Sequence, residues 1–181
     1  FSLYLNIMAL LQSSMVPLGT PAPDFNLLGT DDVMHTLAAY ADKKVLAVIF
    51  MCNHCPYVQK MWDDMVALEK RLPETVQFVG INSNANPAYP EDSFEKMKEY
   101  AQQKGQEFPY LYDADQIAAK AYGAQCTPDI FVYGEERTLA YRGAFEGLEG
   151  AVNTLLEGKK PAEQPLGGAQ VPSMGCSIKW N

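Results

Sequence analysis

Two sequence patterns meet at Cys52 and Cys55, and their junction constrains the fold more than any other part of the chain. Before it, the run from Val45 to Met51 is apolar without interruption. Short apolar runs rich in β-branched residues are typical of a central strand buried on both faces. After it, apolar side chains between Pro56 and Leu72 recur at three- and four-residue spacing, which indicates an amphipathic helix. The chain is therefore predicted to pass from a buried strand directly into a helix, with a Cys-x-x-Cys pair at the turn.

The rest of the chain alternates between strand-like and helix-like periodicity. We expect strands at 25–27, 76–81, 108–112, 129–133 and 138–142, a helical turn at 36–42, and helices at 94–103, 114–122 and 148–156. This order predicts an α/β sandwich with a central mixed β-sheet flanked by helices. We divide the chain into an apolar extension (1–18), one domain (19–158) and a Pro/Gly-rich tail (159–181), whose Ile178 and Trp180 are expected to pack on the domain.

The excess of acidic residues in the chain bears on which partners it can bind. The net charge is -8 and the pI about 4.7, which argues against nucleic acid or an anionic membrane as a partner. No apolar run is long enough to span a bilayer. We expect Arg142, at a strand end, to be a solvated charge.

The N-terminal segment is apolar and carries no charge before Asp24. We expect it to be either vector-derived or a helix that docks on an apolar surface, such as a second copy of the chain in a homodimer. A cytoplasmic location is expected, with a periplasmic or exported one as the alternative, because a Cys-x-x-Cys pair works in either redox environment.

The junction between strand and helix gives the two thiols a chemical role. A helix N-terminus carries unpaired N–H groups and partial positive charge, which stabilise a thiolate. Two intervening residues, Asn53 and His54, let the thiols meet within one turn, as a redox dithiol requires. The alternatives are half of a metal site or two buried structural thiols.

Three segments resemble the redoxin (AhpC/TSA-like) branch of the thioredoxin superfamily. The entry Pro21-Ala-Pro-Asp-Phe-Asn-Leu27, the Cys52-Asn-His-Cys55 dithiol and the Thr127-Pro128 pair match its motifs. The chain is most similar to TlpA/ResA-like thiol–disulfide oxidoreductases, over about 21–156. This resemblance implies a thioredoxin-like sandwich with an extra strand and helix after the active-site helix. It also implies that the Thr127–Pro128 bond is cis and faces the dithiol.

The resemblance also implies roles for the site residues. Cys52 would be the more exposed thiol and attack the substrate, and Cys55 would resolve the mixed disulfide. His54, with Asn53 beside it, would modulate the dithiol by stabilising the Cys52 thiolate. No cofactor is implied, and the expected partners are protein or small-molecule thiols and disulfides.

The segment around Pro128 is expected to form the opposite wall of the site. Pro128 would pack against the dithiol, and the free backbone of Thr127 would pair with an extended substrate segment. Cys126 is either a third redox thiol or a small buried residue. Cys176, in the tail, either resolves a disulfide or has no redox role and lies in a tail that simply packs on the domain.

Departures from the family pattern bear on two alternatives. Peroxiredoxins place Pro seven and Thr or Ser three residues before the peroxidatic cysteine, and this chain has Val45 and Ile49 at those positions before Cys52. Thiol peroxidase activity is therefore disfavoured. A copper or zinc site would use Cys52, Cys55, His54 and Cys126 as soft ligands, but we predict no metal. The buried acid that thioredoxins carry six residues before the first cysteine is replaced by Leu46, so another base is needed.

Overall fold

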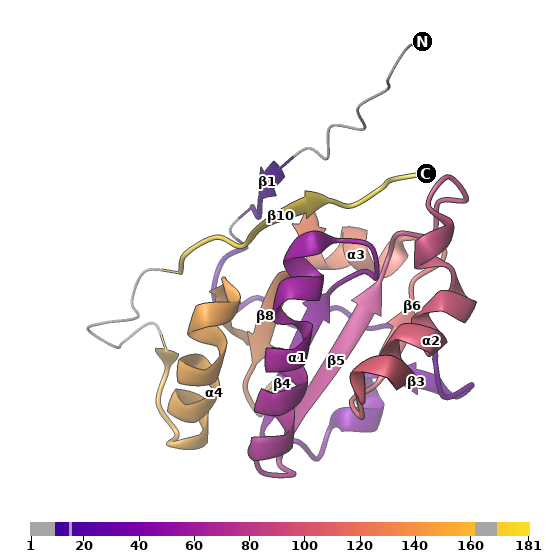
Figure 1. The fold of residues 1–181 in the computed structure, drawn as a ribbon. Helices are drawn as coiled ribbons and strands as arrows, with labels where there is room; N and C mark the ends of the chain where they lie inside the picture. Colours follow the sequence, from indigo (N-terminus) through magenta and orange to yellow (C-terminus); the bar gives the residue numbers. More distant parts are fainter. Residues whose placement is uncertain (1–9, 15, 162–169) are drawn as a thin grey trace.

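The computed structural model describes residues 10–14, 16–161 and 170–181. Its main feature is a seven-stranded mixed sheet of order β3-β2-β6-β5-β4-β8-β9 (Figure 1). The pairs β4–β5 and β5–β6 are parallel, and the other pairs are antiparallel. The strands are β2 (Asn26–Gly29), β3 (Met34–Thr36), β4 (Val45–Phe50), β5 (Val76–Asn82), β6 (Tyr110–Tyr112), β8 (Asp129–Tyr133) and β9 (Leu139–Gly143).

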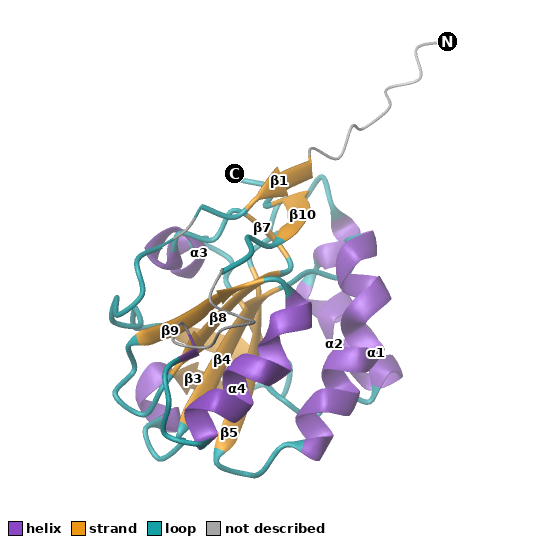
Figure 2. Cartoon of the chain, turned by 90° about the vertical axis from the view of Figure 1, so that its left-hand side faces the viewer, coloured by secondary structure: helices purple, strands orange, loops and turns teal. Residues whose placement is uncertain are grey.

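Helices cover both faces of this sheet, which confirms the predicted α/β sandwich (Figure 2). One face carries α1 (Pro56–Arg71), α2 (Phe94–Lys104) and α4 (Leu148–Leu156), whose apolar side chains share one core cluster. The other face carries α3 (Ile117–Tyr122) and the 3-10 helix η1 (Leu37–Tyr40), which share a second cluster. Between α1 and α3 the chain adds α2 and β6, in agreement with the expected extra strand and helix. None of the described helices is long and apolar enough to cross a membrane.

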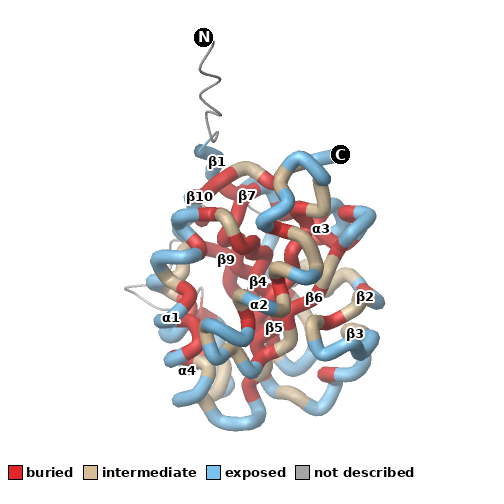
Figure 3. Tube along the Cα trace, turned by 45° about the vertical axis from the view of Figure 1, so that its right-hand side comes forward, coloured by how far each residue is buried: buried red, intermediate tan, exposed pale blue. Residues whose placement is uncertain are grey.

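The predicted strand before the cysteines lies at the centre of the sheet. All six residues of β4 are buried, and the buried colour of this strand can be followed in Figure 3. The strand pairs with β5 on one side and β8 on the other. The helix that follows buries Val58, Trp62 and Met65 against the same core. Burial of each such side chain contributes about 1.5–3 kcal/mol, so the turn between β4 and α1 is held from both sides.

Most expected elements are present, with differences at their ends. α2 ends at Gly105, whose φ of 61° is the left-handed conformation that glycine adopts readily. α3 begins at Ile117 and not at the expected residue 114. The carboxylate of Asp113 accepts from the backbone N–H groups of Ala118 and Ala119, and this contact sets where the helix starts. β3 was not predicted.

Arg142 is a correction, because its side chain is fully buried and not solvated. Its Nη2 lies 2.9 Å from Oδ2 of Asp129, which is also buried, and its guanidinium covers the ring of Phe131. The ion pair joins β8 to β9 inside the domain.

A second, three-stranded sheet joins both ends of the chain to the domain. Its order is β1-β10-β7, all antiparallel, with β1 (Leu10–Gln12), β7 (Cys126–Thr127) and β10 (Met174–Ser177). Residues 10–12 are thus a strand and not the expected helix, while residues 1–9 lie outside the described part. In the tail, Ile178 is buried as predicted, whereas Trp180 is 41% exposed; it lies beside Lys120, whose ammonium is 5.8 Å from its ring centre.

Candidate active site

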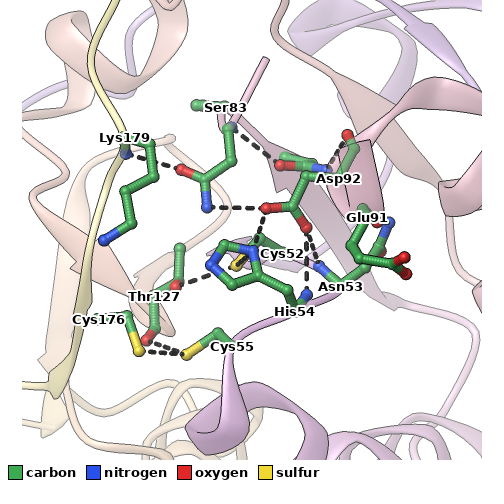
Figure 4. Close-up of polar contacts among 12 residues, drawn as sticks. Cys52, Asn53, His54, Cys55, Ser83, Glu91, Asp92, Thr127, Cys176 and Lys179 are labelled. Carbon is green, nitrogen blue, oxygen red and sulfur yellow. Dashed lines mark hydrogen bonds and ion pairs between the residues drawn. The ribbon is translucent and has the colours of Figure 1, made fainter. Parts of the chain in front are cut away.

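The two cysteines of the motif lie where the sequence predicts, at the end of β4 and the start of α1. Cys55, labelled in Figure 4, is the N-cap of α1. Pro56 follows at the first position of the helix, where the missing N–H of proline is not needed. Both thiols are 0% exposed. The expectation that Cys52 is the more exposed thiol is therefore wrong for this arrangement, because the chain's own Thr127 and C-terminal strand pack against the dithiol.

The opposite wall of the site is the Thr127–Pro128 bond, which is cis as predicted. Thr127 touches both cysteines: its Oγ1 lies 3.4 Å from Cys52 Sγ, and its carbonyl oxygen lies 3.2 Å from Cys55 Sγ. The backbone of Thr127 was expected to be free for a substrate, and this is wrong, because it pairs with Cys176 of β10. The C-terminal strand thus occupies the edge on which an extended substrate segment was expected to bind.

Gly175 allows this close approach of β10. A Cβ at this position would lie 2.0 Å from the carbonyl oxygen of Thr127 and 2.6 Å from its carbonyl carbon, far inside van der Waals contact. Any side chain here would push the strand away from the cis bond.

The third thiol at the site is Cys176, and not Cys126. Cys176 is 2% exposed, and its Sγ lies 3.2 Å from Cys55 Sγ. Cys126 is also buried, but its Sγ faces the carbonyl oxygens of Pro128 and Ser173, each at 3.8 Å. Burial raises the pKa of the Cys126 thiol, which fits a small buried residue. β10 has only four residues, and its two middle residues, Gly175 and Cys176, are both buried, so no period-two pattern marks this strand in the sequence.

The contacts within the thiol cluster shift the pKa values of Cys55 and Cys52 in opposite directions. The pKa of Cys55 is lowered, first by hydrogen bonding to the Cys176 thiol and then to the Cys52 thiol. The carbonyl oxygen of Thr127 opposes this lowering, because it can accept a hydrogen bond from Cys55 only while the Cys55 thiol is protonated. Burial raises the pKa of Cys52 well above its ordinary value. The direction for Cys52 differs from the expected stabilisation of its thiolate in this closed arrangement, and the role of Cys52 as the attacking thiol stays a prediction.

Asp92 also lies in the candidate site, and the sequence did not point to it. It lies in the 3-10 helix η2 (Pro90–Asp92), is fully buried, and its side chain points at the loop between the cysteines. Its Oδ1 accepts from the backbone N–H groups of Asn53 at 2.7 Å and His54 at 3.2 Å. Its Oδ2 pairs with His54 Nδ1 and accepts from Asn84 Nδ2 at 3.2 Å. A buried acid thus contacts the loop between the cysteines, from a different element than the strand that carries Leu46.

Asn53 and His54 act differently from one another. Asn53 does not face the thiols: its amide donates to the carbonyl of Glu91 at 2.9 Å and accepts from the Tyr110 hydroxyl at 2.9 Å. It therefore positions the loop. His54 Nδ1 lies 3.9 Å from Cys52 Sγ, and its ring stacks on Tyr89. His54 thus links the Cys52 thiol to the Asp92 carboxylate.

One combination of side chains in the described part has the donor types of a metal site. A sulfur of Cys52, a nitrogen of His54 and a carboxylate oxygen of Asp92 lie within 4.8 Å of one another. This set differs from the one considered from the sequence. The Asp92 carboxylate already takes part in four hydrogen bonds, which use about all of its lone-pair directions. The arrangement therefore fits a buried hydrogen-bonding hub better than a metal ligand.

A strand–Cys-x-x-Cys–helix unit facing a cis-proline, within a mixed sheet covered by helices, defines a thioredoxin-like protein. The Redoxin family model matches residues 17–155. The chain belongs to the Redoxin family.

Solved structures agree with this assignment. An uncharacterized conserved protein from Geobacillus kaustophilus is 39% identical, with a TM-score of 0.89 over 96% of this chain and 97% of its own. A hypothetical protein from Sinorhizobium meliloti 1021 is 38% identical, with a TM-score of 0.88 over 94% and 98%. A putative thiol:disulfide interchange protein DsbE from Chlorobium tepidum shares the fold, at 20% identity and a TM-score of 0.60 over 80% and 98%. No curated protein matches the chain in sequence.

Proposed function

We propose that this protein is a thiol–disulfide oxidoreductase that works through Cys52 and Cys55. The observation that carries the proposal is the placement of both thiols at the strand–helix junction against the cis Thr127–Pro128 bond, in a chain of the Redoxin family. The substrates would be protein or small-molecule thiols and disulfides.

In the reducing direction, a thiolate of the pair attacks one sulfur of a substrate disulfide. The substrate S–S bond breaks, one substrate sulfur leaves as a thiolate, and a mixed disulfide forms. The second cysteine of the pair then displaces the other substrate sulfur. The substrate gains two electrons and two protons, and the protein is left with a Cys52–Cys55 disulfide. The oxidising direction is the reverse.

We assign the attack to Cys52 in a state in which β10 has moved away. Withdrawal of Cys176 would remove the first cause of the lowered pKa of Cys55. Burial is the first cause of the raised pKa of Cys52, so entry of water would lower it. Cys52 would keep its contacts with Thr127 and His54. Opening would therefore shift the thiolate toward Cys52.

The test is turnover of a model protein disulfide by the wild type and by Cys52→Ser and Cys55→Ser. Both variants are expected to lose turnover by at least about 100-fold, because the two-step exchange needs both thiols. Cys55→Ser should also accumulate a mixed disulfide with the substrate through Cys52. Wild-type turnover in Cys52→Ser would contradict the proposal. Faster consumption of hydrogen peroxide than of the disulfide, or stoichiometric zinc or copper in the purified protein, would favour the peroxidase or metal alternatives.

A further inference from the structure

We propose that Cys176 is a third catalytic thiol, which exchanges with the Cys52–Cys55 disulfide and fastens the C-terminal strand over the substrate edge as a Cys55–Cys176 disulfide. This inference rests on the proposed function of the dithiol. It adds that a strand of the protein itself occupies the substrate edge, with Cys176 in the place expected for a substrate cysteine.

The first support is the contact between the sulfurs. Cys176 Sγ lies 3.2 Å from Cys55 Sγ in a buried position, with Thr127 on the same side of the site (Figure 4). Cys126 is also buried and lies on the strand beside it, yet the hydrogen bonds of its sulfur within the described residues go to carbonyl oxygens and not to a thiol. Burial alone therefore does not explain the placement of Cys176.

The second support is the register of β10. Antiparallel pairing places Cys176 opposite Thr127, the residue whose backbone was expected to receive substrate. Gly175 lets the strand lie against the cis bond without a clash. The strand thus has the placement that an extended peptide with a reactive cysteine would need.

The third support is that hydrogen bonds hold β10 on both sides of Cys176. Before it, Ser173 accepts a backbone bond from Ser13 at 3.0 Å and donates its hydroxyl to Gly143 at 2.6 Å. After it, the backbone N–H of Lys179 donates to Asn84 Oδ1 at 2.9 Å. The side-chain amide of Asn84 also donates to the Asp92 carboxylate. A chain of hydrogen bonds therefore connects the segment after β10 to the carboxylate that holds the cysteine loop. These contacts keep Cys176 in register with Cys55.

The exchange conserves electrons. Cys176 gives up its proton, and its thiolate attacks Sγ of Cys55 in the Cys52–Cys55 disulfide. The Cys52–Cys55 bond breaks as the Cys55–Cys176 bond forms, and Cys52 leaves as a thiolate that takes up a proton. The protein stays oxidised by two electrons throughout. In the product, β10 is covalently held over the backbone of Thr127, so a substrate strand can enter only after the exchange reverses.

The experiment oxidises the intact protein with glutathione disulfide, blocks free thiols with a maleimide in acid, and maps disulfides after trypsin. Cys52 and Cys55 share peptide 45–60, Cys126 lies in 121–137 and Cys176 in 160–179. A link between 45–60 and 160–179 reports the proposed disulfide. It should form in the wild type and increase in Cys52→Ser, which cannot form the competing pair. Cys126→Ser should keep the link.

Gly175→Ala is the matched variant, because it keeps all four thiols and only displaces the strand. The link should fall by at least about tenfold, since exchange depends on proximity. Absence of the link in oxidised Cys52→Ser, or an undiminished link in Gly175→Ala, would overturn the inference. If wild-type peptide 45–60 still forms its internal disulfide in that case, the proposed function stands. If no disulfide involving 45–60 forms in the wild type, both proposals fail.

Discussion

Replacement of Asp92 by alanine should destabilise the protein strongly, although Asp92 lies in a short surface-adjacent turn. The carboxylate is fully buried and accepts from two backbone N–H groups in the cysteine loop and from the Asn84 amide. Alanine offers none of these donors an acceptor. The loop that carries Asn53 and His54 would then lose its main anchor.

The magnitude follows from the donors that have no access to water. Asn53 is 0% exposed and Asn84 is 1% exposed, and an unsatisfied buried donor costs about 1–3 kcal/mol. Two such donors give about 2–6 kcal/mol, against about 5–15 kcal/mol of total stability for a typical domain. With a urea m-value of about 2 kcal/mol/M, the middle of the usual range, the unfolding midpoint should fall by about 1–3 M.

The assay is urea unfolding followed by tryptophan fluorescence under reducing conditions. Asp63→Ala is the control, because Asp63 is 76% exposed and forms a surface ion pair with Lys104; it should change stability by less than about 0.5 kcal/mol. The stability loss of Asp92→Asn should lie between those of Asp92→Ala and Asp63→Ala, because asparagine keeps one acceptor oxygen but turns an N–H group toward Asn84. A midpoint for Asp92→Ala within about 0.2 M of the wild type would refute the role of this carboxylate.

Three further predictions concern other parts of the molecule. Cys176→Ala should move the thiolate absorbance at 240 nm to higher pH, because alanine has no donor to replace the Cys176 hydrogen bond that lowers the pKa of Cys55; an unchanged titration would contradict the thiol cluster. Arg142→Met should cost about 3–5 kcal/mol in urea unfolding, because it leaves Asp129 buried without its partner; a loss below about 1 kcal/mol would contradict this. His54→Ala should make the dithiol reduction potential about 30 mV more negative in glutathione buffers, equivalent to a tenfold change in the exchange constant, and an unchanged potential would remove His54 from the mechanism.

The parts of the fold that the sequence predicted well are those set by local periodicity. β4 and α1 follow from an apolar run and a helical stripe, each readable within one segment. The predicted cis-proline wall came from the family resemblance and not from periodicity. β10 and β7 are too short and too irregular for either signal, and they form only because distant segments pair.

The missed parts of the site share one physical cause. Asp92 follows Cys52 by 40 residues and Cys176 follows Cys52 by 124, so no local sequence pattern joins them. Glu91-Asp-Ser93 reads as the start of a helix, and Ser93 does cap α2; the neighbouring carboxylate serves the dithiol loop instead. Burial of Arg142 was missed for the same reason, since its partner lies on the adjacent strand.

The most direct test of the central claim is a redox titration of peptide 45–60 in the Cys176→Ser background, which removes the third thiol. Maleimide labelling across glutathione buffers should show one two-electron transition from a doubly labelled to an unlabelled peptide. The transition should vanish when Cys52→Ser or Cys55→Ser is added. A peptide that stays doubly labelled in the most oxidising buffer, or a transition that survives either added substitution, would contradict a Cys52–Cys55 redox dithiol.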